Sequence, residues 1–227
     1  MASSLTGALE LLLSPTPMLL SILSVTLQMA LSSSCAALLL GVPLGAALSL
    51  LRFPGRQILV VLNRTLMGLP PVVCGLICYI LFSGVGPLRH WKLLYTVPGM
   101  VIAQIILITP LVTGTMEASL RQTAEAVRET AMGMGLGWGV TLLLILNENR
   151  YQIISAYLMA FGRAMAEVGA VSMVGGAIAY KTNVMTTAIM MYTNRGDFTL
   201  GLSLGILLLL ISFVVNLAVW LLQKRWS

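Results

Sequence analysis

A charge-free and mostly apolar run covers residues 18–51. A helix needs about 20 residues to cross the hydrocarbon core of a bilayer, so this run is too long for one upright span and too short for two. We therefore expect one long, tilted helix that extends beyond the bilayer, with kinks favoured at Gly41 and Pro43. Arg52 and Arg56, which enclose a Phe-Pro-Gly turn, should end it.

The composition supports a membrane location. Of the 227 residues, 58% are hydrophobic and only 9% are charged, and the mean hydropathy is +0.97. A soluble domain carries roughly a quarter charged residues. Membrane barrels show alternation over segments of about ten residues, whereas the apolar runs of this chain are continuous. The sequence therefore predicts an all-α integral membrane protein.

The same criterion predicts five spans in a single membrane domain, 1–227. The expected spans are residues 18–51, 58–82, 94–116, 153–179 and 198–222. Pro70 and Pro71 interrupt the second span, and such breaks need nearby protein or water to satisfy the freed carbonyl groups. We expect the prelude, residues 5–13, to lie on the membrane surface. Residues 184–192 are too short to span.

Lys and Arg residues are distributed unequally between the two sides. With the N-terminus outside, the inner side carries Arg52, Arg56, Arg121, Arg128, Arg150, Lys224 and Arg225, and also Arg64 if it lies at the interface. The outer side then carries Arg89, Lys92, Lys181 and Arg195. Because positive residues gather in cytoplasmic loops, we expect an N-out, C-in topology with loop 117–150 in the cytoplasm. The net charge of +6 therefore reflects topology, and the scarcity of aromatic residues argues against nucleic-acid binding.

Loop 117–150 is the long polar segment of the chain. Glu117 and Arg121 form an attractive i, i+4 pair on a predicted helix. Glycines at positions 133, 135, 137 and 139 should then end that helix. A helix of this kind between two spans can dock on a soluble partner and pass motion to the membrane. A stand-alone secondary transporter or channel, the alternative from another class, has no use for such a segment.

Arg163 and Glu167 lie inside the fourth predicted span. An arginine at mid-bilayer costs roughly 2.5–3.5 kcal/mol on the insertion scale, so this face should point into protein or a water-filled path. In a structural role the pair neutralises itself or bridges neighbouring helices. In a transport role Arg163 attracts an anion while Glu167 holds it or forms a gate. We favour structure or gating, because a transporter must not bind its cargo tightly in mid-path.

The stretch ETAMGMGLGW, residues 129–138, resembles the EAA loop of ABC importer permeases. The residues that match the order of this motif are Glu129, Thr130, Ala131, Met134 and Gly135. In that family the loop is the coupling helix that contacts the ATPase subunit. The resemblance implies that Glu129 makes a polar contact to that subunit and that Gly135 forms the turn.

Other stretches are similar to parts of related permeases. GVPLGAALSLLRFPGR (41–56) and LMGLPPVVCGLICYILF (66–82) resemble the first two helices of oxyanion permeases. FGRAMAEVGAVSMVGG (161–176) and TTAIMMYTNRGDF (186–198) resemble the molybdate/tungstate branch. The sequence around Arg163 and the five-helix layout resemble the tungstate permeases most, which favours tungstate as cargo, with molybdate next. The resemblance implies two cytoplasmic ATPase subunits, which hold ATP and Mg²⁺, and an external oxyanion-binding protein. Because five helices cannot enclose a path and supply two coupling loops, we also expect a homodimer in the cell membrane.

The anion path itself is harder to place. Tetrahedral oxyanions can pass on neutral donors, and the candidate hydroxyls are those of Ser32, Ser33, Ser34, Thr109, Thr113 and Ser172. Each of these hydroxyls is more readily satisfied by its own helix backbone. Cys74 and Cys78 have no nearby His, so we expect no metal site. The chain has no Walker A motif or Ser/His/Asp set, and we expect no cofactor and no catalysis by this subunit.

Overall fold

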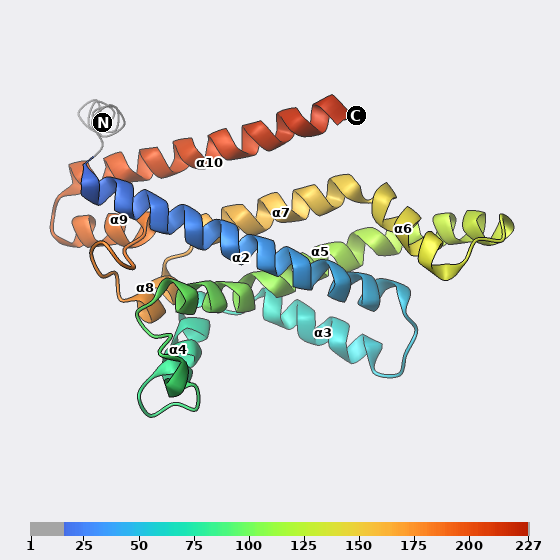
Figure 1. Cartoon of the computed structure of the whole chain (residues 1–227), viewed down its shortest axis with the longest axis horizontal. Coiled ribbons are helices and arrows are strands. Elements are labelled where there is room, and N and C mark those ends of the chain that lie inside the picture. Colours follow the sequence, from blue (N-terminus) through green and yellow to red (C-terminus); the bar gives the residue numbers. More distant parts are fainter. Residues whose placement is uncertain (1–15, 227) are drawn as a thin grey trace. The chain divides into compact units, whose positions relative to one another are not determined.

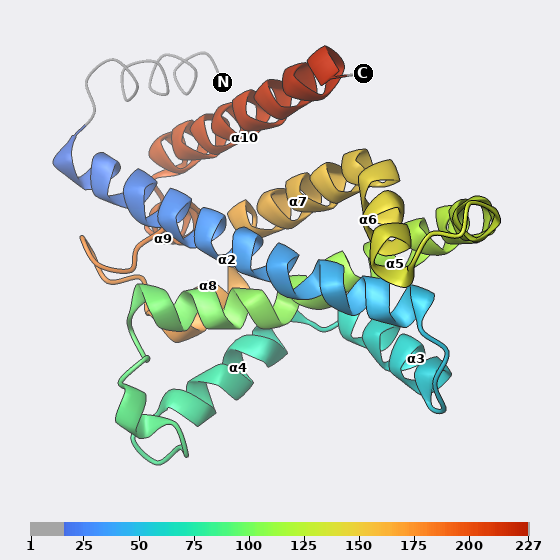
Figure 2. The same cartoon turned by 45° about the vertical axis from the view of Figure 1, so that its right-hand side comes forward.

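The computed structural model describes residues 16–226, and the prelude at 5–13 lies outside the described residues (Figures 1 and 2). The described chain is helical and contains no β-strand. In order, the elements are α2 (Pro17–Leu50), α3 (Arg56–Met67), α4 (Pro71–Phe82), the 3₁₀ helix η1 (Arg89–Trp91), α5 (Val97–Gly133), α6 (Trp138–Glu148), α7 (Arg150–Met165), α8 (Gly169–Gly175), α9 (Met185–Asn194) and α10 (Phe198–Trp226).

Three of these helices, α2, α5 and α10, are long and apolar enough to cross a membrane. Two helix pairs satisfy the same test when combined, α3 with α4 and α7 with α8, each with a bend at a short break. The count of candidate spans among the described residues is therefore three, or up to five if each bent pair is one span. The predicted class, an all-α membrane protein, is confirmed. The N-out, C-in orientation stays a prediction.

Helix α5 differs from its sequence-based outline, in which the third span ended at residue 116. In the structure α5 continues without a break through 37 residues to Gly133. Residues 117–132 contain neither Gly nor Pro and are rich in Ala, Glu, Arg and Gln, which favour helix. The polar segment therefore extends the membrane helix instead of forming a separate element.

The fourth predicted span also differs, because α7 ends at Met165 and α8 begins at Gly169. At the break, the Thr186 hydroxyl donates a 2.7 Å hydrogen bond to the carbonyl oxygen of Glu167. The Ala170 N–H donates to the Glu167 carboxylate at 3.1 Å. Side chains thus satisfy backbone groups that a continuous helix would have paired internally.

The chain divides into two compact units. The first contains Pro70–Gln104, the residues from Phe161 onward and the start of α2 up to Ser33. There α9 packs on α10 and α4 packs on α8. Gly75 permits the second contact, because a Cβ at this position would lie 2.7 Å from the Cα of Ala170. The core of this unit includes Leu19, Ile22, Met185, Ala188, Leu204 and Leu207.

The second unit contains Ser34–Leu69 and Ile105–Ala160. Two glycines bring α2 close to α5: a Cβ at Gly41 would lie 2.7 Å from the Cβ of Val112, and one at Gly45 would lie 2.7 Å from that of Met116. Small residues that allow backbones to approach in this way are typical of helix contacts in membranes. Both α2 and α5 pass from one unit into the other, and the single membrane domain 1–227 stays a prediction.

Candidate functional site

The sequence-predicted coupling residues lie at the end of α5, which holds Glu129, Thr130 and Ala131, and in the turn that follows it, which holds Met134 and Gly135. The Leu136 N–H bonds to the carbonyl of Ala131 at 2.9 Å, and the Gly135 N–H bonds to that of Met132 at 3.0 Å. Gly135 has φ +70°, in the left-handed region. This combination is a Schellman motif, which ends a helix and needs glycine where φ is positive. Gly135 is therefore the turn residue that the sequence predicted.

Helix α6 packs back on α5 to make a helical hairpin. Asn149, between α6 and α7, is fully buried and accepts hydrogen bonds at 3.2 Å from the hydroxyls of both Ser119 and Thr123. Its own amide donates to the carbonyl of Ile145 at 2.8 Å. Ala131 and Ile145 are also fully buried. These contacts fix the end of α6 against α5 within the second unit, and the sequence analysis did not identify Asn149.

The outer surface of this hairpin is both apolar and polar. Glu129 and Thr130 are exposed, and the side chains of Met132 and Met134 are 63% and 61% exposed. A shallow groove of about 330 Å³ lies between α5 and α6. Its lining residues are Ala126, Val127, Thr130, Ala131, Met134, Leu144, Asn147 and Glu148. Exposed methionines beside a charge suit an adaptable protein-binding surface.

Glu117 is the centre of a charge cluster in the second unit. Its side chain is 4% exposed and lies 3.6 Å from Arg56, 3.7 Å from Arg64 and 4.0 Å from Arg121. The sequence indicated only the i, i+4 partner, Arg121, because the other two arginines are far away along the chain. The carboxylate joins the start and end of α3 to α5, and it neutralises one of the surrounding positive charges.

The break between α7 and α8 holds the other predicted pair. Arg163 Nη1 lies 2.8 Å from Glu167 Oε2, and the Arg163 side chain is 39% exposed while that of Glu167 is 3% exposed. The pairing predicted from the i, i+4 spacing is present, although Glu167 lies beyond the end of α7. With Arg163 on one oxygen and the Ala170 N–H on the other, the buried carboxylate is well satisfied.

The hydroxyl candidates behave differently from one another. Ser172 Oγ donates to the carbonyl of Gly169 at 3.0 Å, which is the backbone contact that the sequence analysis favoured. Thr109 Oγ1 and Thr113 Oγ1 are buried and have no hydrogen-bond partner among the described residues. Thr109 and Thr113 belong to the second unit, whereas Arg163, Glu167 and Ser172 belong to the first. The predicted path residues therefore form two groups, one in each unit.

Metal-ligating side chains do not gather anywhere in residues 16–226 in groups of three or more. Cys74 and Cys78 are both buried and not disulfide-bonded, and the Cys74 thiol points to the carbonyl of Ala103 at 3.7 Å. These cysteines therefore contribute packing in the contact between α4 and α5 within the first unit.

The long apolar helices and the hairpin define a multi-pass helical membrane protein. The family described as binding-protein-dependent transport system inner membrane component matches residues 37–227. The chain belongs to this family, and it is therefore a membrane-embedded permease subunit of an ABC importer. The resemblance seen in the sequence is confirmed.

Relatives over most of the chain are also permeases. The tungstate uptake system permease protein TupB of Peptoclostridium acidaminophilum is 32% identical over 99% of this chain and 98% of its own length. A protein of the same name from Campylobacter jejuni is 36% identical over 67% of this chain and 64% of its own length. The sulfate transport system permease protein CysW of Escherichia coli is 26% identical over 92% of this chain and 76% of its own length.

Proposed function

We propose that this chain is the membrane subunit of an ATP-driven oxyanion importer whose cargo is tungstate, with molybdate as the next candidate. The observation that carries the proposal is the hairpin of α5 and α6, which offers an exposed docking surface next to a membrane helix. The relatives named for tungstate uptake support the choice of cargo. A secondary transporter or channel, the alternative class, has no role for that surface.

In this proposal the hairpin couples the permease to a cytoplasmic ATPase subunit. Glu129 supplies a polar contact, Thr130 and Met134 line the groove that receives the partner, and Gly135 holds the turn. Ala131, which is buried, keeps the two helices close. ATP and Mg²⁺ belong to the partner, and this chain hydrolyses nothing itself. An external oxyanion-binding protein delivers the cargo.

Two copies of the chain would enclose the path and present one hairpin to each of two ATPase subunits. ATP binding would draw the two hairpins together and switch the dimer from inward-open to outward-open. We assign Arg163 and Glu167 to holding or gating, because the carboxylate already has two partners. The unpaired hydroxyls of Thr109 and Thr113, rather than that of Ser172, are the better donors for a passing anion.

The function is tested by reconstitution. The chain is purified with its co-purifying subunits, placed in liposomes with the external binding protein, and assayed for tungstate, molybdate and sulfate uptake by elemental mass spectrometry. We expect uptake that requires ATP, a co-purifying ATPase and the binding protein, with tungstate preferred. Tungstate uptake by the chain alone, without ATP, would instead identify a secondary transporter or channel.

A further inference from the structure

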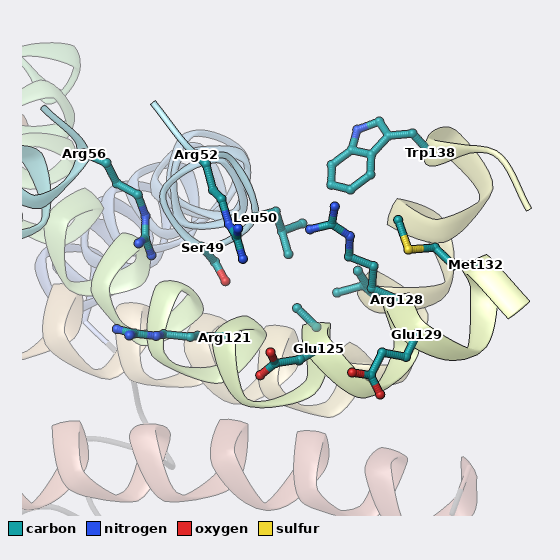
Figure 3. A pocket seen from close by; sticks show the side chains of 12 residues that line it. Ser49, Leu50, Arg52, Arg56, Arg121, Glu125, Arg128, Glu129, Met132 and Trp138 are labelled. Atoms are coloured by element: carbon teal, nitrogen blue, oxygen red, sulfur yellow. The ribbon is translucent and has the colours of Figure 1, made fainter. Parts of the chain in front are cut away.

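The second unit contains another cavity, whose chemical character differs from that of the groove on the hairpin. Its volume is about 420 Å³, within the range of small-molecule sites of about 300–1,000 Å³. The end of α2 with the loop that follows it, helix α5 and helix α6 form its walls (Figure 3). The charged residues of its lining are Arg52, Arg56, Arg121 and Arg128 against Glu125 and Glu129.

The positive charge of this cavity is only partly neutralised by carboxylates. Arg56 and Arg121 are shared with Glu117, at 3.6 Å and 4.0 Å. Arg52 and Arg128 form no ion pair with any residue in the range 16–226. In Figure 3 their guanidinium groups extend into the space between the α2 loop and α5, whereas the carboxylates of Glu125 and Glu129 point away from them.

A neutral donor completes the arrangement. Ser49 Oγ, which lines the cavity, is buried and has no hydrogen-bond partner among the described residues. A buried hydroxyl without a partner lowers the stability of the folded protein unless a ligand or water forms a hydrogen bond with it. Two free guanidinium groups and a hydroxyl match the oxygen atoms of a phosphate group, which arginine binds in a two-pronged manner.

We propose that this cavity binds a phosphate group, held by Arg52 and Arg128 with Ser49 as an additional donor. The group can come from an anionic lipid or from free phosphate. Arg52 lies two residues beyond the end of the long apolar helix α2 at Leu50, and Trp138 on the opposite wall is 47% exposed. Arginine and tryptophan are typical of the level of lipid headgroups, so a lipid can reach the site.

The test uses the full chain in nanodiscs of neutral phosphatidylcholine, with no ATPase subunit present. One arm titrates inorganic phosphate by calorimetry, and the other incorporates phosphatidic acid and counts retained lipids by native mass spectrometry. The double variant Arg52→Gln/Arg128→Gln should weaken binding about tenfold or more, as expected for charge-assisted hydrogen bonds. The control Arg89→Gln/Arg195→Gln removes the same charge from exposed positions outside the cavity and should bind as the wild type does.

Ser49→Ala provides an independent check of the site. Without ligand it should leave the thermal midpoint unchanged or raise it, because it deletes an unsatisfied hydroxyl. In the binding assays Ser49→Ala should lower the affinity for inorganic phosphate or phosphatidic acid several-fold. Binding of inorganic phosphate identifies a free anion as the source, and binding of phosphatidic acid alone identifies a lipid. Absence of binding in both arms, or equal loss in the Arg89→Gln/Arg195→Gln control, would overturn the proposal.

Discussion

Gly135→Val should uncouple ATP hydrolysis from transport while the protein still inserts into the membrane. No atom lies within 4 Å of a Cβ built on Gly135, so the substitution causes no clash. Its cost comes from the backbone, because φ is +70°. A non-glycine residue held in the left-handed region costs about 1–3 kcal/mol, and the value is largest for β-branched side chains.

That cost affects the two hydrogen bonds of the turn, from Leu136 to Ala131 and from Gly135 to Met132. If the ATPase subunit binds only the formed turn, a penalty of about one to three kcal/mol reduces its apparent affinity by a factor of roughly 5–160. Gly135→Asn should have a smaller effect, because asparagine tolerates this conformation. Coupling should therefore be strongest with Gly at position 135, weaker with Asn and weakest with Val.

The assay is the ratio of tungstate transported to ATP hydrolysed in proteoliposomes, together with the amount of ATPase subunit that co-purifies. Gly133→Val is the matched control. Gly133 is also exposed, has no neighbour within 4 Å of a built Cβ, and does not have a positive φ. Normal coupling in Gly135→Val, or an equal defect in Gly133→Val, would refute the argument from the turn.

Three further substitutions test other contacts. Glu167→Gln removes the charge that faces Arg163 at 2.8 Å and should lower the free energy of unfolding by about 1.5–3 kcal/mol. In liposomes it should change the leak of substrate or the coupling to ATP hydrolysis. A change in which oxyanion is taken up would contradict the gating role. Glu117→Gln should destabilise the second unit by about 1–2 kcal/mol, measured as a lower thermal midpoint in detergent, since the arginines around it stay partly solvated. Gly75→Ala should lower the free energy of unfolding by about 1–3 kcal/mol through overpacking against α8, while Gly205→Ala, with no neighbour within 4 Å, should leave the midpoint unchanged or raise it, because alanine favours a helix more than glycine does.

The class of fold and the turn at Gly135 were predictable because their signals are local. Continuous apolar runs determine membrane helices, and a glycine after a helix-forming segment determines a Schellman turn such as that at Gly135. The pairing of Arg163 with Glu167 was predictable for the same reason, since only four positions separate them.

Other features depend on contacts between distant segments. Glu117 is joined to Arg56 and Arg64 of α3, and Asn149 is joined to Ser119 and Thr123 of α5. The break near Glu167 depends on the hydroxyl of Thr186, which lies on another helix. Hydropathy and helical spacing contain no information about such partners, so the sequence predicted a continuous fourth helix where the structure has two.

Within the second unit, the stretch of α5 from Thr113 to its end at Gly133 has no interruption. At about 1.5 Å per residue it is a rod of roughly 30 Å whose hydrogen-bonded backbone cannot be compressed without breaking bonds. A displacement of the turn along the helix axis therefore moves the buried hydroxyl of Thr113 by the same distance, because the helix between them does not shorten. Probes attached at either end of this rod should relax with one common rate constant when the nucleotide state changes.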